Sequence, residues 1–166
     1  EEEGPIYYRL EKDDVTVTPG LRGRFETGRV QVIAEGGDCL LLSMGGISAE
    51  ASAACAALQM RGIVCTHAVI ADVHPAPREH LAELLGKHGI VCTVEAHYTS
   101  GGIGSLVAEL IAEAGLPCRL LRLGFASMPD GRIGPQSHLL AKHGLDAMGI
   151  AAAVESGVSS GWIQQS

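Results

Sequence analysis

Residues 94–115, VEAHYTSGGIGSLVAELIAEAG, contain the change of pattern that decides the fold. An apolar run ends in an acid and a histidine, Glu95 and His97, and two adjacent glycines, Gly101 and Gly102, then open a helix-like run. A strand that leads through a short turn into a helix is the unit from which α/β domains are built. The question is whether this turn binds a ligand, carries out chemistry or only connects two elements.

The same alternation extends to both sides of this stretch. Continuous apolar runs, rather than alternating ones, are typical of parallel strands covered on both faces. We therefore expect an α/β fold of three layers, α/β/α, with a mostly parallel five-stranded sheet. Strands are predicted at 29–35, 38–44, 63–75, 90–97 and 118–125, and helices at 47–62, 77–89, 101–115, 135–144 and 146–156.

Two local patterns refine this prediction. The turn at 35–38 is too short for a helical crossover, so we expect one strand at an edge of the sheet to run opposite to the others. In the helix at 47–62, four small or apolar residues share one face, and the many alanines predict very close packing against neighbours. The four residues of this face are Ile47, Ala51, Ala54 and Leu58.

Composition excludes several classes of function. The 166 residues fit one domain, and a hydrophobic content of 46% is typical of a globular protein. The net charge of −7 argues against a nucleic-acid surface, which needs a basic patch. No apolar run approaches the length of a membrane span, and the first ten residues lack the pattern of a secretion signal. We therefore expect a cytoplasmic protein with neither nucleic-acid nor membrane partners.

The five cysteines do not have the spacing of a zinc site or a disulfide framework. They lie within separate apolar runs, and the chain contains no C-x-x-C pair. Buried, reduced thiols are the better interpretation, and no metal site is predicted. The five are Cys39, Cys55, Cys65, Cys92 and Cys118.

The glycine turn has two readings. Gly102 and Gly104 follow a strand and open a helix, as a dinucleotide fingerprint requires, but Val107 occupies the position of the third glycine. The following strand carries Arg119 and Arg122 rather than the expected acid. The alternative is a close approach of backbone to strand where only glycine fits. This second interpretation is the favoured one.

On that interpretation the helix begins at 101–104, and Thr99 or Ser100 caps its free N–H groups. Those groups would also attract an anion or the carboxylate of a partner. A Cβ at Gly102 is expected to clash with the preceding strand or to force an unfavourable φ. His97 is expected to form a local hydrogen bond or one across a subunit contact.

The motif resembles the C-terminal domain of transketolases, in particular the small subunit of the split type. There the pattern runs Glu-x-His-x-x-x-Gly-Gly-x-Gly-Ser, and the resemblance covers roughly residues 4–155. It assigns to the matching residues a structural or interface role rather than a catalytic one. The matching residues are Glu95, His97, Gly101, Gly102, Gly104 and Ser105. One departure is at 77–79, where Pro-Arg-Glu replaces a family pattern like Leu-Asp-Glu.

The resemblance also implies what lies elsewhere in the enzyme. Residues 1–12 resemble the last strand of a preceding pyrimidine-binding domain, 13–28 a linker, 29–157 the C-terminal domain and 158–166 a tail. The family's closing strand reads like Arg-Leu-Gly-Arg, and its second arginine contacts substrate phosphate. Here Arg9 matches the first arginine and Lys12 replaces the second, so these two are the candidate substrate-binding residues.

Thiamine diphosphate and Mg²⁺ are implied for the complete enzyme, bound mainly by domains that these residues do not include. The chain is therefore expected to be inactive in isolation, and to assemble with copies of itself or with a subunit that carries the diphosphate-binding domain. The function implied is that of an assembly domain in a transferase of two-carbon ketol units between sugar phosphates. Alternatives are the C-terminal domain of a 1-deoxyxylulose-5-phosphate synthase or of a 2-oxo acid dehydrogenase beta subunit. A hypothesis outside this enzyme family is a free-standing α/β module that binds a ligand or regulates another protein through the helix start at Gly101.

Overall fold

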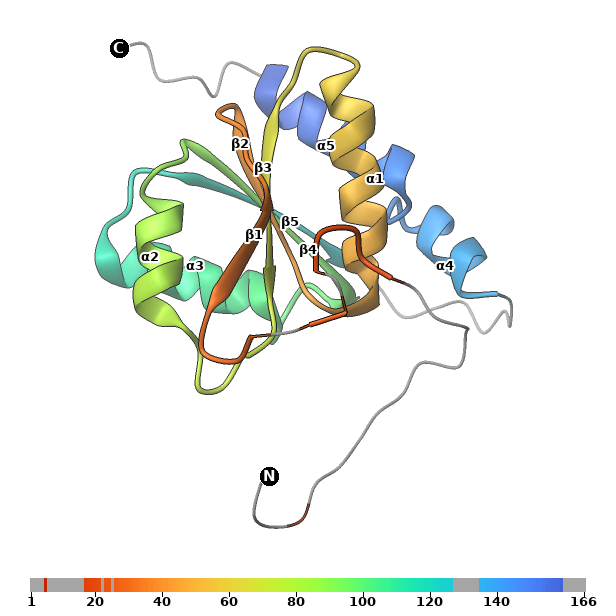
Figure 1. Ribbon diagram of the computed structural model, residues 1–166. Coiled ribbons are helices and arrows are strands. Elements are labelled where there is room, and N and C mark those ends of the chain that lie inside the picture. The colour runs from red at the N-terminus through yellow and green to blue at the C-terminus, as the bar shows by residue number, and fades with distance from the viewer. Residues whose placement is uncertain (1–4, 6–16, 22, 25, 127–134, 160–166) are drawn as a thin grey trace.

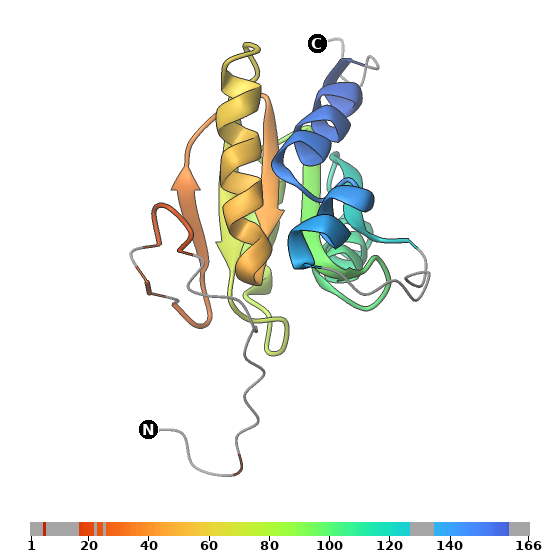
Figure 2. The same cartoon turned by 90° about the vertical axis from the view of Figure 1, so that its right-hand side faces the viewer.

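The computed structural model describes residues 5, 17–21, 23–24, 26–126 and 135–159, which form three layers (Figure 1). Helices α1 and α5 cover one face of a five-stranded sheet, with α4 beside them, and α2 and α3 cover the other face (Figures 1 and 2). The predicted α/β/α architecture is therefore confirmed. The elements are β1 (Val30–Ala34), β2 (Cys39–Ser43), a 3₁₀ turn (Gly45–Ile47), α1 (Ser48–Gln59), β3 (Cys65–Ile70), α2 (Arg78–Leu85), β4 (Ile90–Tyr98), α3 (Ile103–Ala114), β5 (Arg119–Phe125), α4 (Gln136–Lys142) and α5 (Ala147–Ser159).

The strand order in the sheet is β1-β3-β2-β4-β5. β2 pairs in parallel with β3 and β4, and β4 pairs in parallel with β5. β1 lies at an edge and runs antiparallel, as predicted, but its neighbour is β3 rather than β2, the next strand along the chain. The short connection between β1 and β2 is therefore not a hairpin.

Local contacts explain how four residues can pass across β3. Asp38 forms two hydrogen bonds with Val64, the residue before β3. The Asp38 carboxylate accepts one from the Val64 N–H at 2.6 Å, and the Asp38 N–H donates one to the Val64 carbonyl at 3.0 Å. Gly36 lies so close that a Cβ there would be 2.3 Å from the same carbonyl oxygen. A glycine at this position lets the connection lie directly on the amino end of β3.

The core is divided between the two faces of the sheet. Every residue of β2 is buried, and its side chains alternate, so that Leu41 faces α1 and α5 while Leu40 and Leu42 face α2 and α3. The four residues predicted to share one face of the first helix, at 47–62, are all buried. Ala51 and Ala54 of α1 and Ala151 of α5 have no exposed surface, which confirms the expected close packing of small residues.

Several boundaries differ from those predicted. α2 ends at Leu85 with Gly86 as its cap, several residues before the predicted end at 89. α5 continues to Ser159, three residues past the predicted helix end at 156. The strand predicted near the N-terminus falls outside the described residues, apart from Pro5. In the part of the chain that the structure describes, no helix has the length and apolar character of a membrane span.

Candidate functional site

The glycine turn lies where β4 ends and α3 begins. Glu95, near the end of β4, is only 5% exposed and directs its carboxylate at the start of α3. One oxygen accepts a hydrogen bond from the Ile103 N–H at 3.0 Å, and the other accepts one from the Gly104 N–H at 3.1 Å. These N–H groups lack partners within the helix and carry the positive end of its dipole, so a carboxylate here stabilises the helix strongly.

The predicted cap was therefore wrong in two respects. The helix begins at Ile103 rather than Gly101, with Gly102 as its N-cap, and its N–H donors are satisfied by Glu95 rather than by Thr99 or Ser100. The serine that does take part is Ser105, whose hydroxyl oxygen accepts a hydrogen bond from the Gly101 N–H at 2.9 Å. The buried carboxylate already occupies the capping position at the start of α3.

The glycines of the motif make room for this carboxylate. A Cβ on Gly102 would lie 1.6 Å from a Glu95 carboxylate oxygen, which confirms the predicted clash with the preceding strand. A Cβ on Gly104 would lie 3.0 Å from the other carboxylate oxygen and 2.9 Å from the Cδ of Arg122 on β5. Gly101 has a φ of +86°, a backbone conformation that glycine adopts without strain.

This geometry decides between the two readings of the turn. In a dinucleotide site the N–H groups at the helix start face the pyrophosphate. Here Ile103 and Gly104 donate to an internal carboxylate that is itself buried. The anion expected at this helix start is thus supplied by the same chain, and the glycine pattern serves helix capping.

His97 does not join this group. It is exposed, and its Nδ1 lies 2.9 Å from the carbonyl oxygen of the next residue, Tyr98, so the predicted local hydrogen bond is confirmed. Its ring is the first of an edge-to-face series with Tyr98, Phe125 and His143, at centroid distances of 6.0, 6.5 and 4.9 Å in turn. We call these four residues the aromatic row.

The sequence prediction missed the aromatic row. Its strongest signal is that Phe125 ends one predicted strand and Tyr98 directly follows another, and in the structure they are register partners at the ends of β4 and β5. The row ends at His143, whose buried Nε2 has no hydrogen-bond partner among the described residues. The row runs from the carboxyl ends of β4 and β5 to the end of α4, and its rings at Phe125 and His143 are only partly exposed.

A hollow of about 490 Å³ lies beside the glycine turn, between the connection that precedes α2 and the first turns of α3. Arg78 lines it and forms an ion pair with Glu113 of α3. This arginine stands where the family pattern has an acid, and its role here is to join α2 to α3. The other lining residues include Val73, His74, Ser105 and Glu109.

Two further predictions concern cofactors and substrate. No group of three His, Cys, Asp or Glu side chains that could hold a metal ion occurs within the described ranges. The candidate substrate-binding residues Arg9 and Lys12 lie outside those ranges.

Comparison with known proteins places these features in a family. Residues 28–150 match the family described as "Transketolase, C-terminal domain". The chain belongs to this family. A solved structure described as "Split gene transketolase, inactive beta4 tetramer" has a TM-score of 0.74 and 36% identity to this transketolase C-terminal domain, covering 82% of the chain and 44% of its own length.

Curated relatives agree with this membership. One of the subunits of the apulose-4-phosphate transketolase of Actinobacillus succinogenes is 33% identical over 87% of the chain and 46% of its own length. The putative transketolase C-terminal section of Methanocaldococcus jannaschii is 32% identical over 93% of the chain and 48% of its own length. A 1-deoxy-D-xylulose-5-phosphate synthase of Syntrophotalea carbinolica is 32% identical over 93% of the chain and 24% of its own length. The chain thus spans about half the length of the first two relatives and a quarter of the synthase.

Proposed function

We propose that the chain is the C-terminal assembly domain of a split-type transketolase, which transfers a two-carbon ketol unit between sugar phosphates with thiamine diphosphate. The single observation that carries this role is the buried Glu95 carboxylate at the start of α3. It closes the glycine-rich helix start that could have bound a phosphate group. The hydrogen bonds of Glu95 join β4 to α3 at the position where a ligand would otherwise bind.

The contacts with the rest of the enzyme are assigned to the carboxyl edge of the sheet. The exposed end of β4, with His97 and Tyr98, presents rings and backbone at this edge. Exposed aromatic rings are enriched in protein interfaces because they bury much area with few rotatable bonds. The contacts of the glycine turn join the end of β4 to the start of α3 beside this edge. The residues assigned to this supporting role are Glu95, Gly101, Gly102, Gly104 and Ser105.

The cofactor is assigned to other domains. The described residues offer neither a cluster of metal-binding side chains nor, at the glycine turn, a free helix start for a diphosphate. Thiamine diphosphate with Mg²⁺ would supply the carbon–carbon bond chemistry when bound by those domains. From this chain, Arg9 and Lys12 are proposed to contact the substrate phosphate. They belong to the proposed segment 1–12, which is followed by a linker at 13–28, the C-terminal domain at 29–157 and a tail at 158–166.

The proposed partners are a second copy of the chain and a subunit that carries the diphosphate-binding domain. One relative is named as a subunit of a transketolase, and the split-gene structural neighbour is described as a tetramer. Both descriptions support assembly from separate chains. We place the assembled enzyme in the cytoplasm.

The second candidate is the C-terminal domain of a 1-deoxyxylulose-5-phosphate synthase. It is favoured by the match of 93% of the chain to such a synthase at 32% identity. A 2-oxo acid dehydrogenase beta subunit is a further alternative. The free-standing ligand-binding module loses its main support, because the helix start that it would use is occupied by Glu95.

Reconstitution tests the proposal. The protein that contains these residues is combined with the diphosphate-binding subunit from the same genome, and product formation is followed with two donors. Ketol transfer from a ketose phosphate to an aldose phosphate, with no turnover by the 166-residue chain alone, supports the transketolase. Turnover only with a 2-oxo acid donor supports the second candidate. Failure of the two proteins to associate or to turn over either donor refutes the proposed function.

A further inference from the structure

Three cysteine side chains meet at the amino edge of the sheet, opposite the glycine turn. Cys39 and Cys65 are the first residues of β2 and β3 and are direct register partners in that parallel pair. Their sulfur atoms are 3.2 Å apart. Cys55 of α1 covers them, and its thiol forms a hydrogen bond with Cys65. We call Cys39, Cys55 and Cys65 the thiol cluster.

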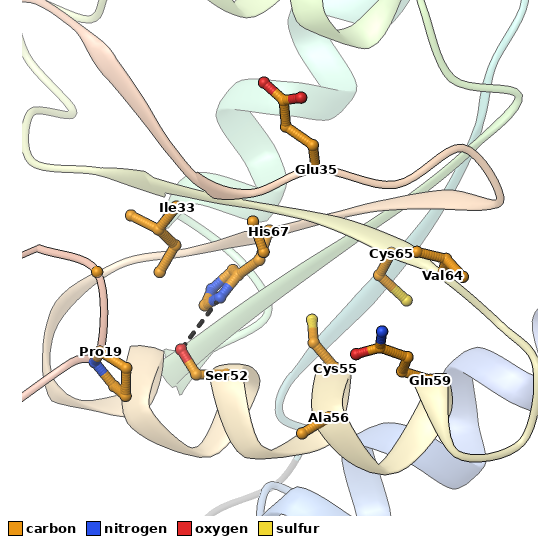
Figure 3. Close-up of a pocket in the computed structure, with 12 residues that line it drawn as sticks. Pro19, Ile33, Glu35, Ser52, Cys55, Ala56, Gln59, Val64, Cys65 and His67 are labelled. Carbon is orange, nitrogen blue, oxygen red and sulfur yellow. Dashed lines mark hydrogen bonds between the residues drawn. The ribbon is translucent and has the colours of Figure 1, made fainter.

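A cavity of about 300 Å³ leads to this cluster between α1, β1 and the start of β3 (Figure 3). The sulfur atoms of Cys55 and Cys65 point toward the same space in Figure 3, and both residues line the cavity. Cys39 does not line it and has no exposed surface. A small molecule that enters the cavity therefore meets Cys65 or Cys55 before Cys39.

The neighbouring thiols distinguish the three sulfurs electrostatically. Hydrogen bonds from Cys39 and then Cys55 lower the pKa of Cys65, while burial acts against them. The bond to Cys65 and burial raise the pKa of Cys39 and of Cys55. Among the three, Cys65 is the thiol whose pKa is lowered, so it loses its proton most readily. The thiolate is the nucleophilic form of cysteine.

His67 lies beside the cavity but does not act as a base. Its Nε2 is 2.8 Å from the Ser43 hydroxyl, its Nδ1 is 3.2 Å from the Ser52 hydroxyl, and it is 1% exposed. Burial lowers the pKa of His67 to about 4, so the ring is neutral at physiological pH. The ring lines the cavity as a polar group, and its hydrogen bonds to Ser43 and Ser52 fix its position.

We propose that Cys65 is a site of reversible oxidation by small hydroperoxides, with Cys39 as the resolving thiol. The Cys65 sulfur attacks the peroxide, a sulfur–oxygen bond forms, and the oxygen–oxygen bond breaks. The leaving oxygen takes the proton that Cys65 gave up and departs as water or an alcohol. The Cys39 sulfur then attacks the Cys65 sulfur, a disulfide forms, and the departing hydroxide leaves as water with the proton of Cys39.

The fold already holds the two thiols in a geometry that suits the product. Neighbouring strands lie roughly 4.8 Å apart, and the Cα atoms of a disulfide lie about 4.4–6.8 Å apart. The register pairing of Cys39 with Cys65 brings their Cα atoms to such a separation. The product covalently joins β2 to β3, and a dithiol reductant reverses it.

Peptide mapping of the wild-type protein is the primary test. The reduced protein is treated with hydrogen peroxide, alkylated under denaturing conditions and weighed by mass spectrometry. Trypsin leaves Cys39 and Cys55 in one peptide, 30–61, so a second cut after Glu50 is needed to separate them. We expect the loss of two hydrogen atoms and a cross-link between Cys39 and Cys65. It should form while Cys118 stays reduced, because Cys65 lines the cavity and its pKa is lowered, whereas burial raises the pKa of Cys118.

Variants assign the roles. Cys39→Ser is expected to leave Cys65 as a sulfenic acid that a 1,3-dione reagent traps, whereas Cys65→Ser abolishes both products. Cys118→Ser, a change outside the cluster, serves as the matched control and leaves the cross-link unchanged. A Cys55–Cys65 cross-link in its place overturns the assignment of Cys39. Cys65 that stays reduced while Cys118 oxidises overturns the proposal, and this readout needs only the wild-type protein.

Discussion

Glu95 provides the sharpest test of the site. Its carboxylate is buried and accepts two hydrogen bonds from the first N–H groups of a twelve-residue helix. Glu95→Ala removes both acceptors and leaves buried donors without partners. Glu95→Gln retains one acceptor oxygen but turns an NH₂ group toward the second donor, and it removes the charge that faces the helix dipole.

The magnitudes follow from these contacts. A hydrogen bond to a charged group contributes about 1.5–3 kcal/mol. Loss of both gives about 3–6 kcal/mol for Glu95→Ala, and loss of one with the charge gives about 2–3 kcal/mol for Glu95→Gln. In a domain of this size, 1 kcal/mol shifts Tm by about 2–4 °C. The alanine variant is therefore expected to melt roughly 10 °C below the wild type.

Urea unfolding followed by circular dichroism measures both free energies of unfolding. Glu109→Gln is the matched control, because Glu109 is an exposed carboxylate on the same helix. Its effect is expected to stay within about 0.5 kcal/mol. If Glu95→Gln and Glu109→Gln unfold at the same urea concentration, the buried carboxylate does not hold the helix start and the capping argument is wrong.

Three further outcomes are expected. Gly102→Val costs about 3 kcal/mol or more in urea unfolding, because its Cβ would lie 1.6 Å from a Glu95 oxygen, whereas Gly37→Ala, with open space around it, is nearly neutral. Burial lowers the pKa of His67 to about 4 in the folded protein, against about 6.5 in the unfolded chain. The neutral ring therefore contributes its full stabilisation above pH 6.5, and this contribution is lost as the pH falls toward 4. Between pH 7 and 5 the wild type should lose about 2 kcal/mol more than His67→Gln, and parallel urea curves would contradict this. In the assembled enzyme, His97→Ala should weaken association in sedimentation more than it slows turnover; the opposite result makes the histidine catalytic.

The layers and most elements could be predicted because they depend on short-range patterns. Continuous apolar runs mark strands covered on both faces, and the small residues at Ala51 and Ala54 mark a helix face that packs closely. The neighbour of β1 could not be predicted from the length of the turn. Four residues span up to about 13 Å when extended, which exceeds two strand spacings of about 4.8 Å each. A four-residue connection is therefore long enough either for a hairpin between β1 and β2 or for a crossing over β3, and its length does not distinguish the two.

The sequence predicted the position of the glycine turn but not the contacts made there, and the interface role of its residues stays a prediction. The motif residues other than His97 do gather at the carboxyl edge, since the strand, turn and helix are consecutive. The capping partner was missed because preferences for Ser and Thr describe residues next to the helix start, whereas Glu95 reaches it from the strand. The thiol cluster was missed for a related reason. Cys39 and Cys65 meet only through the register of two parallel strands, which spacing along the chain does not reveal.

The position of β2 in the sheet has a consequence for how the chain reaches this structure. β2 comes early in the sequence, yet both of its neighbours follow it, and residues 44–89 separate it from β4. Parallel pairings between distant segments form slowly, because a long loop must close before any contact is gained. Until β4 arrives, one edge of the apolar run Leu40 to Leu42 has no partner and is open to strands of other chains. During synthesis, the interval between β2 and β4 is therefore the period when this domain is most exposed to aggregation.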